Sequence, residues 1–143
     1  MAVRVRVRLR AGEREVVAAA LANSGYEAEE PEVVVPVRVA ERLSLYPELP
    51  RGARVEEYVA VGGARVRAFR VEMGVEVAVL AGDREVGPVR ATVVIVPGED
   101  EVVLSDRALD ALRIVLVRPG KGIWRFTDDP LGVERASEPL EVW

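Results

Sequence analysis

Apolar and polar residues alternate over the first ten positions of the chain. Val3, Val5, Val7 and Leu9 are separated by arginines, so one face of this stretch is apolar and the other is cationic. Alternation with a period of two predicts a half-buried antiparallel β-strand. Four arginines on one face could bind an anion, but the favoured interpretation is a solvated face that also protects a sheet edge.

A second strand is predicted over 14–22, and its apolar run stops abruptly at Asn23, Ser24 and Gly25. A buried strand that delivers a small polar residue into a turn with glycine can present that side chain at a cleft. The acidic stretch 26–32 that follows contains a proline and is predicted to be a loop. Its glutamates could bind a cation or a basic peptide, but surface solvation is favoured because no ligand spacing recurs.

The remaining pattern predicts more strands and only two helices. Short valine-rich runs predict strands at 33–35, 55–61, 64–71, 75–80, 89–96, 102–104, 114–117 and 123–126. Helical spacing occurs over 37–45, where Pro36 opens the turn, and over 106–112, where Ser105 is the expected cap. The Gly62-Gly63 pair marks a hairpin between two of the strands.

Length and patterning together predict one domain with an extended tail. The 143 residues suffice for one core, and neither an internal repeat nor a domain boundary is visible before Thr127. We therefore expect a domain over 1–126 and a tail over 127–143. The tail ends in an apolar segment, which we expect to dock on its own subunit or on a dimer partner.

Composition narrows the possible chemistry. The chain has no cysteine and no histidine, which excludes disulfides, thiolate nucleophiles and histidine-based metal sites, and we expect no metal and no cofactor. A net charge of −4 with both signs interspersed argues against nucleic-acid binding, and no apolar run is long enough for a membrane span. We expect a soluble cytoplasmic protein. The absence of glutamine, with a single asparagine and a single lysine, is typical of proteins from hot environments.

The order of these motifs resembles the retropepsin-like aspartic peptidases of the single-lobe, archaeal type. In that family an apolar strand ends in Asp-Thr/Ser-Gly and is followed by a loop, a strand, a proline and the pattern A-x-x-L-G-L. Here the chain reads Asn23-Ser24-Gly25, then Pro36 and A-E-R-L-S-L. A hairpin and an apolar turn that feeds a short helix follow in the family's order. Ser44 and Ser105 stand where the family has glycine, and the resemblance covers 1–126.

The resemblance implies a mostly β fold, a closed β-barrel lobe with two short helices. It also implies a homodimer, because each chain supplies half of a two-fold site. The implied site residues are Asn23, Ser24 and Gly25 at the catalytic motif, Val61, Gly62, Gly63 and Ala64 in a flap over the substrate, and Leu104, Ser105 and Asp106 in a second loop.

The asparagine changes the chemistry that the resemblance implies. In the family, two close aspartates share one proton, so that one activates water while the other polarises the scissile carbonyl. A carboxamide does not titrate and cannot act as a general base. Three hypotheses follow: a catalytically silent dimer that binds an extended peptide, an active aspartic endopeptidase that uses Asp106, Glu27 or deamidated Asn23, and a structural dimer without a ligand in its cleft.

Overall fold

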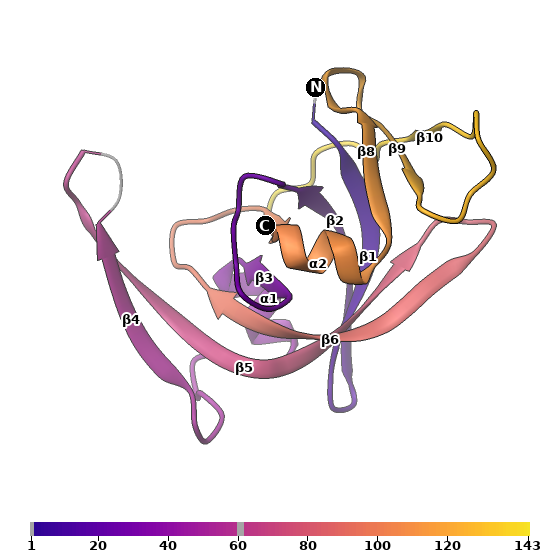
Figure 1. Ribbon diagram of the computed structural model, residues 1–143. Coiled ribbons are helices and arrows are strands. Elements are labelled where there is room, and N and C mark those ends of the chain that lie inside the picture. Colours follow the sequence, from indigo (N-terminus) through magenta and orange to yellow (C-terminus); the bar gives the residue numbers. More distant parts are fainter. Residues whose placement is uncertain (1, 60–61) are drawn as a thin grey trace.

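Six β-strands close into a barrel around a valine-rich interior (Figure 1). The computed structural model describes residues 2–59 and 62–143. In order around the ring, the strands are β1 (Arg4–Ala11), β2 (Arg14–Ala22), β7 (Val102–Leu104), β3 (Glu32–Val35), β6 (Glu85–Ile95) and β5 (Arg65–Leu80). The pairing of β5 with β1 closes the ring. The predicted mostly β chain with a closed barrel is confirmed.

β1 shows how strict alternation builds the barrel wall. Val5, Val7 and Leu9 are at most 1% exposed and fill the interior, while the arginines of this strand face outward. The expectation that β1 protects a sheet edge was wrong, because β1 pairs with β2 along its length and with β5 over its second half. The strand that closes the barrel against β1 is β5, which lies far away in the sequence, so no local pattern predicts the pairing. The outward arginines form ion pairs, which are Arg4–Glu101, Arg6–Glu138, Arg8–Glu85 and Arg10–Glu15.

β5 is one long, bent strand where the sequence predicts two. Its pairing with β6 shifts register between Val71 and Val75, and Met73 between them has a positive φ of 49°. A Cβ on Gly74 would lie 2.7 Å from Cγ1 of Val71, so the chain can bend this tightly only with glycine there. The irregularity is therefore a bulge that curves the strand around the barrel and does not end it.

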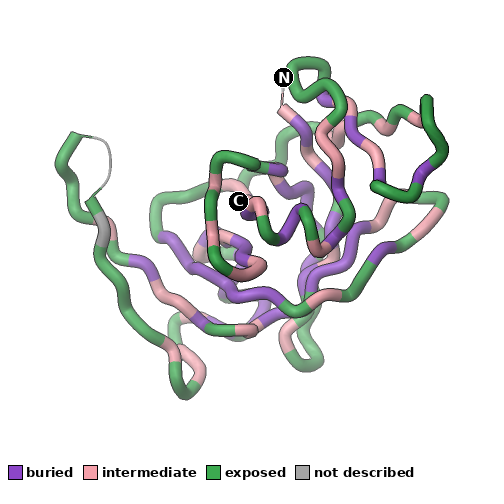
Figure 2. The backbone as a smooth tube through the Cα atoms, in the orientation of Figure 1, coloured by how far each residue is buried: buried purple, intermediate pink, exposed green. Residues whose placement is uncertain are grey.

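β4 (Arg54–Val59) pairs with β5 alone and extends away from the barrel (Figure 1). The register runs from Arg54 opposite Arg70 to Val59 opposite Arg65, which confirms the predicted pairing of the two arms. Figure 2 shows this extension as largely exposed, whereas buried segments line the barrel.

The two predicted helices are present. Helix α1 (Val37–Arg42) follows Pro36 and buries Val39 and Ala40. Ser44, at the end of this turn, has a left-handed φ of 58°, a conformation that suits the glycine of the family pattern better than serine. Helix α2 (Asp106–Ala111) begins after Ser105, whose hydroxyl caps it by accepting a hydrogen bond from the backbone N–H of Ala108 at 3.2 Å.

The C-terminal part forms a second, small sheet. It contains β8 (Ile114–Arg118), β9 (Ile123–Phe126) and β10 (Arg135–Ala136), and the 3-10 turn η1 (Pro119–Lys121) joins β8 to β9. Asp129 fixes the turn after β9 by accepting hydrogen bonds from the N–H of Phe126 and from the guanidinium of Arg135, both at 2.8 Å. Hydrogen bonding to Arg135 holds the pKa of the buried Asp129 carboxyl well below its ordinary value.

The last residues of the chain lie against the barrel of their own subunit. The N–H of Glu138 donates to the carbonyl of Arg4 at 2.9 Å, and the N–H of Trp143 donates to the carbonyl of Asp100 at 2.8 Å. The carboxylate of Glu141 accepts from the N–H of Ala19 at 2.9 Å. The tail therefore covers the outer side of β1 and β2.

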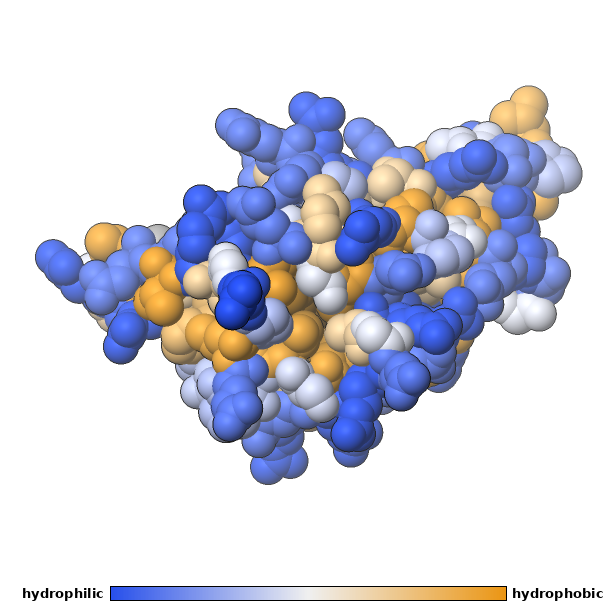
Figure 3. Space-filling model, turned by 90° about the horizontal axis from the view of Figure 1, so that it is seen from below, coloured by the Kyte–Doolittle hydropathy of each residue, from blue (hydrophilic) through white to orange (hydrophobic). Residues whose placement is uncertain are grey.

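The charged residues lie mainly on the surface. Seen from below, most side chains are hydrophilic and the hydrophobic ones gather in the middle of the face (Figure 3). Among the described residues, no helix is long and apolar enough to cross a membrane.

Candidate functional site

The Asn23 turn lies at the end of β2, where that strand leaves the barrel. The N–H of Asn23 donates to the carbonyl of Leu104 at 3.1 Å, which keeps the turn in register with β7. The side-chain Oδ1 of Asn23 accepts the N–H of Gly25 at 3.0 Å and forms an Asx turn. A Cβ at Gly25 would lie 3.2 Å from that oxygen, which favours glycine. Asn23, Ser24 and Gly25 are all exposed in the single chain.

The predicted second loop supports this turn from within. Ser105 is fully buried, and its hydroxyl also accepts the N–H of Glu32 at 3.0 Å. Asp106 accepts the N–H of Ala28 at 3.0 Å through Oδ1, and its own N–H donates to the carbonyl of Tyr26 at 2.9 Å. Leu104 belongs to the barrel core. These residues brace the loop after the Asn23 turn and do not line the groove described next.

A groove of about 520 Å³ opens beside Asn23 on the outside of the barrel. Its floor is a row of register partners on neighbouring strands, Leu21 on β2, Val103 on β7, Val34 on β3, Val94 on β6 and Arg70 on β5. The interior of the barrel takes the alternate residues of the same strands, so the outward set forms a continuous apolar strip. The other lining residues are Tyr26, Glu32, Glu56, Val96, Glu99 and Glu101.

Arg70 forms an ion-pair network with two glutamates at one end of the groove. Its guanidinium bonds Glu30 at 2.7 Å and Glu32 at 2.8 Å, and hydrogen bonding to Glu32 raises the pKa of Arg70. Tyr26 donates its hydroxyl to Glu32 at 2.7 Å, and Thr92 donates its hydroxyl to Glu30 at 2.9 Å. The network ties β5, at the base of the β4–β5 hairpin, to the loop that follows the Asn23 turn.

Sequence reasoning missed this network. The glutamates of 26–32 were expected to be solvated, but Glu32 is buried and both Glu30 and Glu32 bind Arg70. An arginine on the outward side of a strand has an ordinary local pattern, and nothing in the sequence pairs it with a loop forty residues earlier. Hydrogen-bonding residues that converge from two distant segments are visible only in the folded chain.

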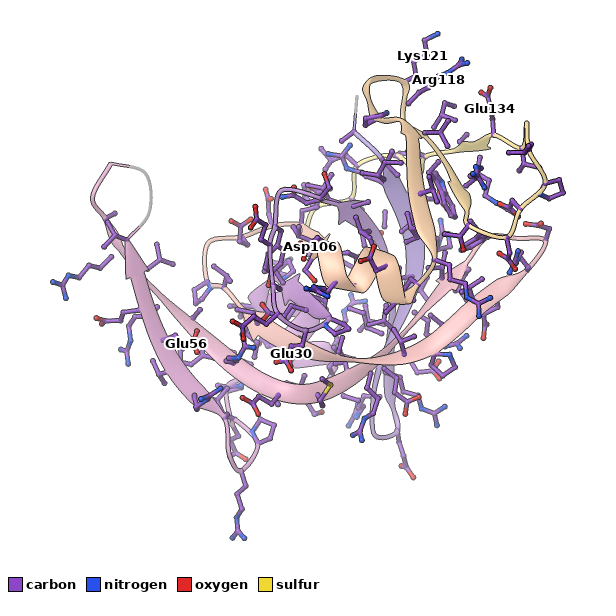
Figure 4. All side chains as sticks on the ribbon, in the orientation of Figure 1. Glu30, Glu56, Asp106, Arg118, Lys121 and Glu134 are labelled. Atoms are coloured by element: carbon purple, nitrogen blue, oxygen red, sulfur yellow. The ribbon has the colours of Figure 1, made fainter. Side chains whose placement is uncertain are left out.

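The carboxylates considered as replacements for a catalytic aspartate lie elsewhere. Asp106 already accepts backbone N–H groups, and neither Asp106 nor Glu27 lines the groove with Asn23. In Figure 4, Glu30 and Asp106 lie near the end of the barrel from which the hairpin extends, and Glu56 lies on β4. The labelled Arg118, Lys121 and Glu134 lie at the opposite end of the molecule.

The expected flap is only partly described. Val61 lies outside the described residues, whereas Gly62 and Gly63 adopt positive φ angles of 96° and 86° that glycine tolerates. Gly62, Gly63 and Ala64 are exposed and do not line the groove in the single chain. Of the described hairpin, Glu56 and Arg70 reach the groove.

Within the described residues, no group of three or more His, Cys, Asp or Glu side chains is placed to hold a metal ion. The functional groups that meet in the groove are an exposed carboxamide, a phenol, one guanidinium and several carboxylates. Oδ1 of Asn23 accepts from Gly25, and Nδ2 makes no hydrogen bond with any described residue. The site can therefore donate and accept hydrogen bonds, but Asn23 cannot take up a proton from water.

The fold of the chain is retropepsin-like. The solved structure of the retroviral protease-like domain of Ddi1 from Leishmania major is similar to this chain, with a TM-score of 0.54 and 15% identity over 97% of each chain. At this identity the similarity concerns the fold. No protein-family model matches the sequence. No curated protein matches it either.

Proposed function

We propose that two copies of this chain associate around their Asn23 turns and hold an extended peptide in the resulting two-fold cleft without cutting it. A retropepsin-like lobe contributes half of such a cleft, and an isologous dimer completes it. The exposure of Asn23, Ser24 and Gly25 at the end of a barrel strand leaves these residues available for contact with a second copy.

The observation that carries the proposal is the joint lining of one groove by Asn23 and the outward apolar strip. An apolar floor bordered by a few polar groups is typical of ligand sites, where the apolar contacts supply affinity and the polar groups fix orientation. The free Nδ2 of Asn23 can donate to a carbonyl of a bound peptide, as a binding group and not as a base.

The absence of peptidase activity follows from the chemistry of the carboxamide. Removal of a positioned general base lowers the rate of a reaction by about 10²–10⁴-fold, and here both members of the pair are absent. Asp106 is occupied by backbone donors and does not compensate. Deamidation of Asn23 would restore a carboxylate, so the state of this residue must be established in the same sample.

The test combines mass, binding and turnover on protein whose Asn23 has been verified by peptide mass spectrometry. Light scattering should give a dimer, and a labelled extended peptide should bind and remain intact at acid and neutral pH. A monomer, or a dimer that binds no peptide, would contradict the proposal. Cleavage by verified Asn23 protein that persists in Asn23→Ala would assign hydrolysis to another residue.

A further inference from the structure

We propose that the groove selects extended peptides that carry a lysine or arginine side chain next to alternating aliphatic residues. This inference rests on the proposed peptide-binding function and specifies its ligand. Its basis is the combination of the apolar strip with an excess of carboxylates among the residues that line the groove.

The strip has the right length for one face of an extended peptide. Leu21, Val103, Val34 and Val94 lie on four adjacent strands, so the strip spans three strand spacings, about 14 Å. In an extended peptide, the side chains of residues i, i+2 and i+4 share one face and also span about 14 Å. Two aliphatic side chains can therefore lie on the valines while the next side chain on the same face reaches the Arg70 end.

Charge in the groove as a whole is not balanced. Four carboxylates line the groove, from Glu32, Glu56, Glu99 and Glu101, against one guanidinium, from Arg70. Glu101 is paired with Arg4, and Arg70 is shared between Glu30 and Glu32.

Glu56 and Glu99 are the carboxylates left over. Neither carboxylate makes an ion pair or a hydrogen bond with any described residue, although Glu56 lies close enough to Arg70 to raise the pKa of that arginine. Glu56 reaches the groove from β4, and Glu99 from the turn between β6 and β7. A cationic side chain bound in the groove would meet unpaired carboxylates on two separate elements that line it.

The groove already contains one arrangement of this kind. The guanidinium of Arg70 bonds Glu30 and Glu32 at 2.7 Å and 2.8 Å, which shows that one cation bridging two glutamates fits the local geometry. Charge-assisted hydrogen bonds of this type are stronger than neutral ones. A ligand cation would therefore contribute affinity, whereas a ligand carboxylate would be repelled.

The experiment compares two labelled peptides on the dimeric protein. The probe is acetyl-Ser-Val-Ser-Val-Ser-Arg-Ser-amide, and its partner has glutamine in place of arginine; blocked ends remove the terminal charges. By fluorescence anisotropy at low salt, the arginine peptide should bind about tenfold more tightly. The preference should shrink at high salt, because part of it comes from solvent-exposed charge.

Matched variants identify the carboxylates that cause the preference for the arginine peptide. Glu56→Gln combined with Glu99→Gln should bring the affinities for the two peptides within about twofold of each other. Glu57→Gln is the control, since Glu57 is the neighbour of Glu56 on β4, pairs with Arg65 and lies outside the groove. It should keep the full preference.

Three negative outcomes can be told apart. Equal binding of both peptides to the unmodified protein would overturn the selectivity and leave the peptide-binding function intact. Absence of binding by either peptide to a folded dimer would contradict the peptide-binding function itself, and the selectivity with it. A preference that survives the Glu56→Gln, Glu99→Gln change would show that these carboxylates do not cause it.

Discussion

The turns that follow β2 and β7 start at equivalent positions, because the two strands pair in parallel with Ala22 opposite Leu104. Each turn begins with a small polar residue, Asn23 in one and Ser105 in the other. Ser105 is fully buried, and its hydroxyl accepts two backbone hydrogen bonds. Asn23 is exposed and its side chain accepts one, within its own turn.

This difference separates a structural turn from a turn available for function. A buried hydroxyl with two backbone partners cannot change without leaving those N–H groups unsatisfied. An exposed carboxamide with a free Nδ2 contributes little to the fold but offers a hydrogen bond to a ligand. Equivalent positions in the sheet therefore have different roles, and the burial of the side chain decides which.

The largest expected effect is a gain of peptidase activity in Asn23→Asp. If the dimer brings both residues 23 together, the variant has two close carboxylates, and the pKa of one of them should be raised so that the pair shares a proton. Cleavage of an unfolded protein substrate at acid pH should exceed that of the Asn23 protein by at least about 10²-fold.

Two controls are needed to interpret a gain of peptidase activity in Asn23→Asp. Asn23→Ala should remain inactive, and light scattering should give Asn23→Asp the same mass as the parent protein. An inactive Asn23→Asp dimer that still binds peptide would show that the cleft lacks more than a carboxylate.

Urea unfolding of two variants tests whether Ser105 stabilises the fold more than Asn23 does. Ser105→Ala should lower the free energy of unfolding by about 3 kcal/mol, because it leaves two buried N–H groups without a partner and removes the cap of α2. Asn23→Ala should lower it by about 0.5 kcal/mol, because its hydrogen bond is exposed to water. Equal losses in urea unfolding would refute the assignment of separate roles.

The local sequence pattern predicted the role of Ser105 better than the surroundings of Asn23. Ser105 before a stretch with helical spacing identified the cap of α2, and alternation identified the buried face of β1. The sequence did not reveal the closure of the barrel by β5 against β1 or the Arg70 network, because both join segments far apart in the chain. The groove was likewise hidden, since its floor takes one residue from each of several strands.

Acid stability bears on any assay of Asn23→Asp at low pH. The pKa of Asp129 is lower in the folded chain than its ordinary value. The ionised carboxylate therefore stabilises the folded state above about pH 4, and this stabilisation is lost as the pH falls below that. Asp129→Asn should lower the free energy of unfolding at pH 7 by about 2 kcal/mol and weaken its decline below pH 4. If urea unfolding of Asp129→Asn showed the same loss of stability below pH 4 as the parent protein, Asp129 would not be the cause of that loss.

A further expected effect concerns the β4–β5 hairpin. Gly62 and Gly63 are exposed, and a Cβ at either position would meet no atom of any described residue beyond its chain neighbours within 4 Å, so their amides should exchange with solvent far faster than those of β6 in the barrel wall. Gly63→Ala forces a side chain into a positive φ and should cost about 1 kcal/mol. Hydrogen exchange at the tip as slow as in β6 would argue against a movable flap.

The central claim, that two Asn23 turns meet at a two-fold axis, can be tested by cross-linking. The chain has no cysteine, so Ser24→Cys introduces a single thiol into the turn, and Glu13→Cys introduces one into the exposed β1–β2 turn as a control. A disulfide forms only when the two Cα atoms lie within about 7 Å of each other. Mild oxidation should convert Ser24→Cys to a covalent dimer and leave Glu13→Cys monomeric in a denaturing gel. A dimer in light scattering whose Ser24→Cys chains fail to cross-link would contradict the account.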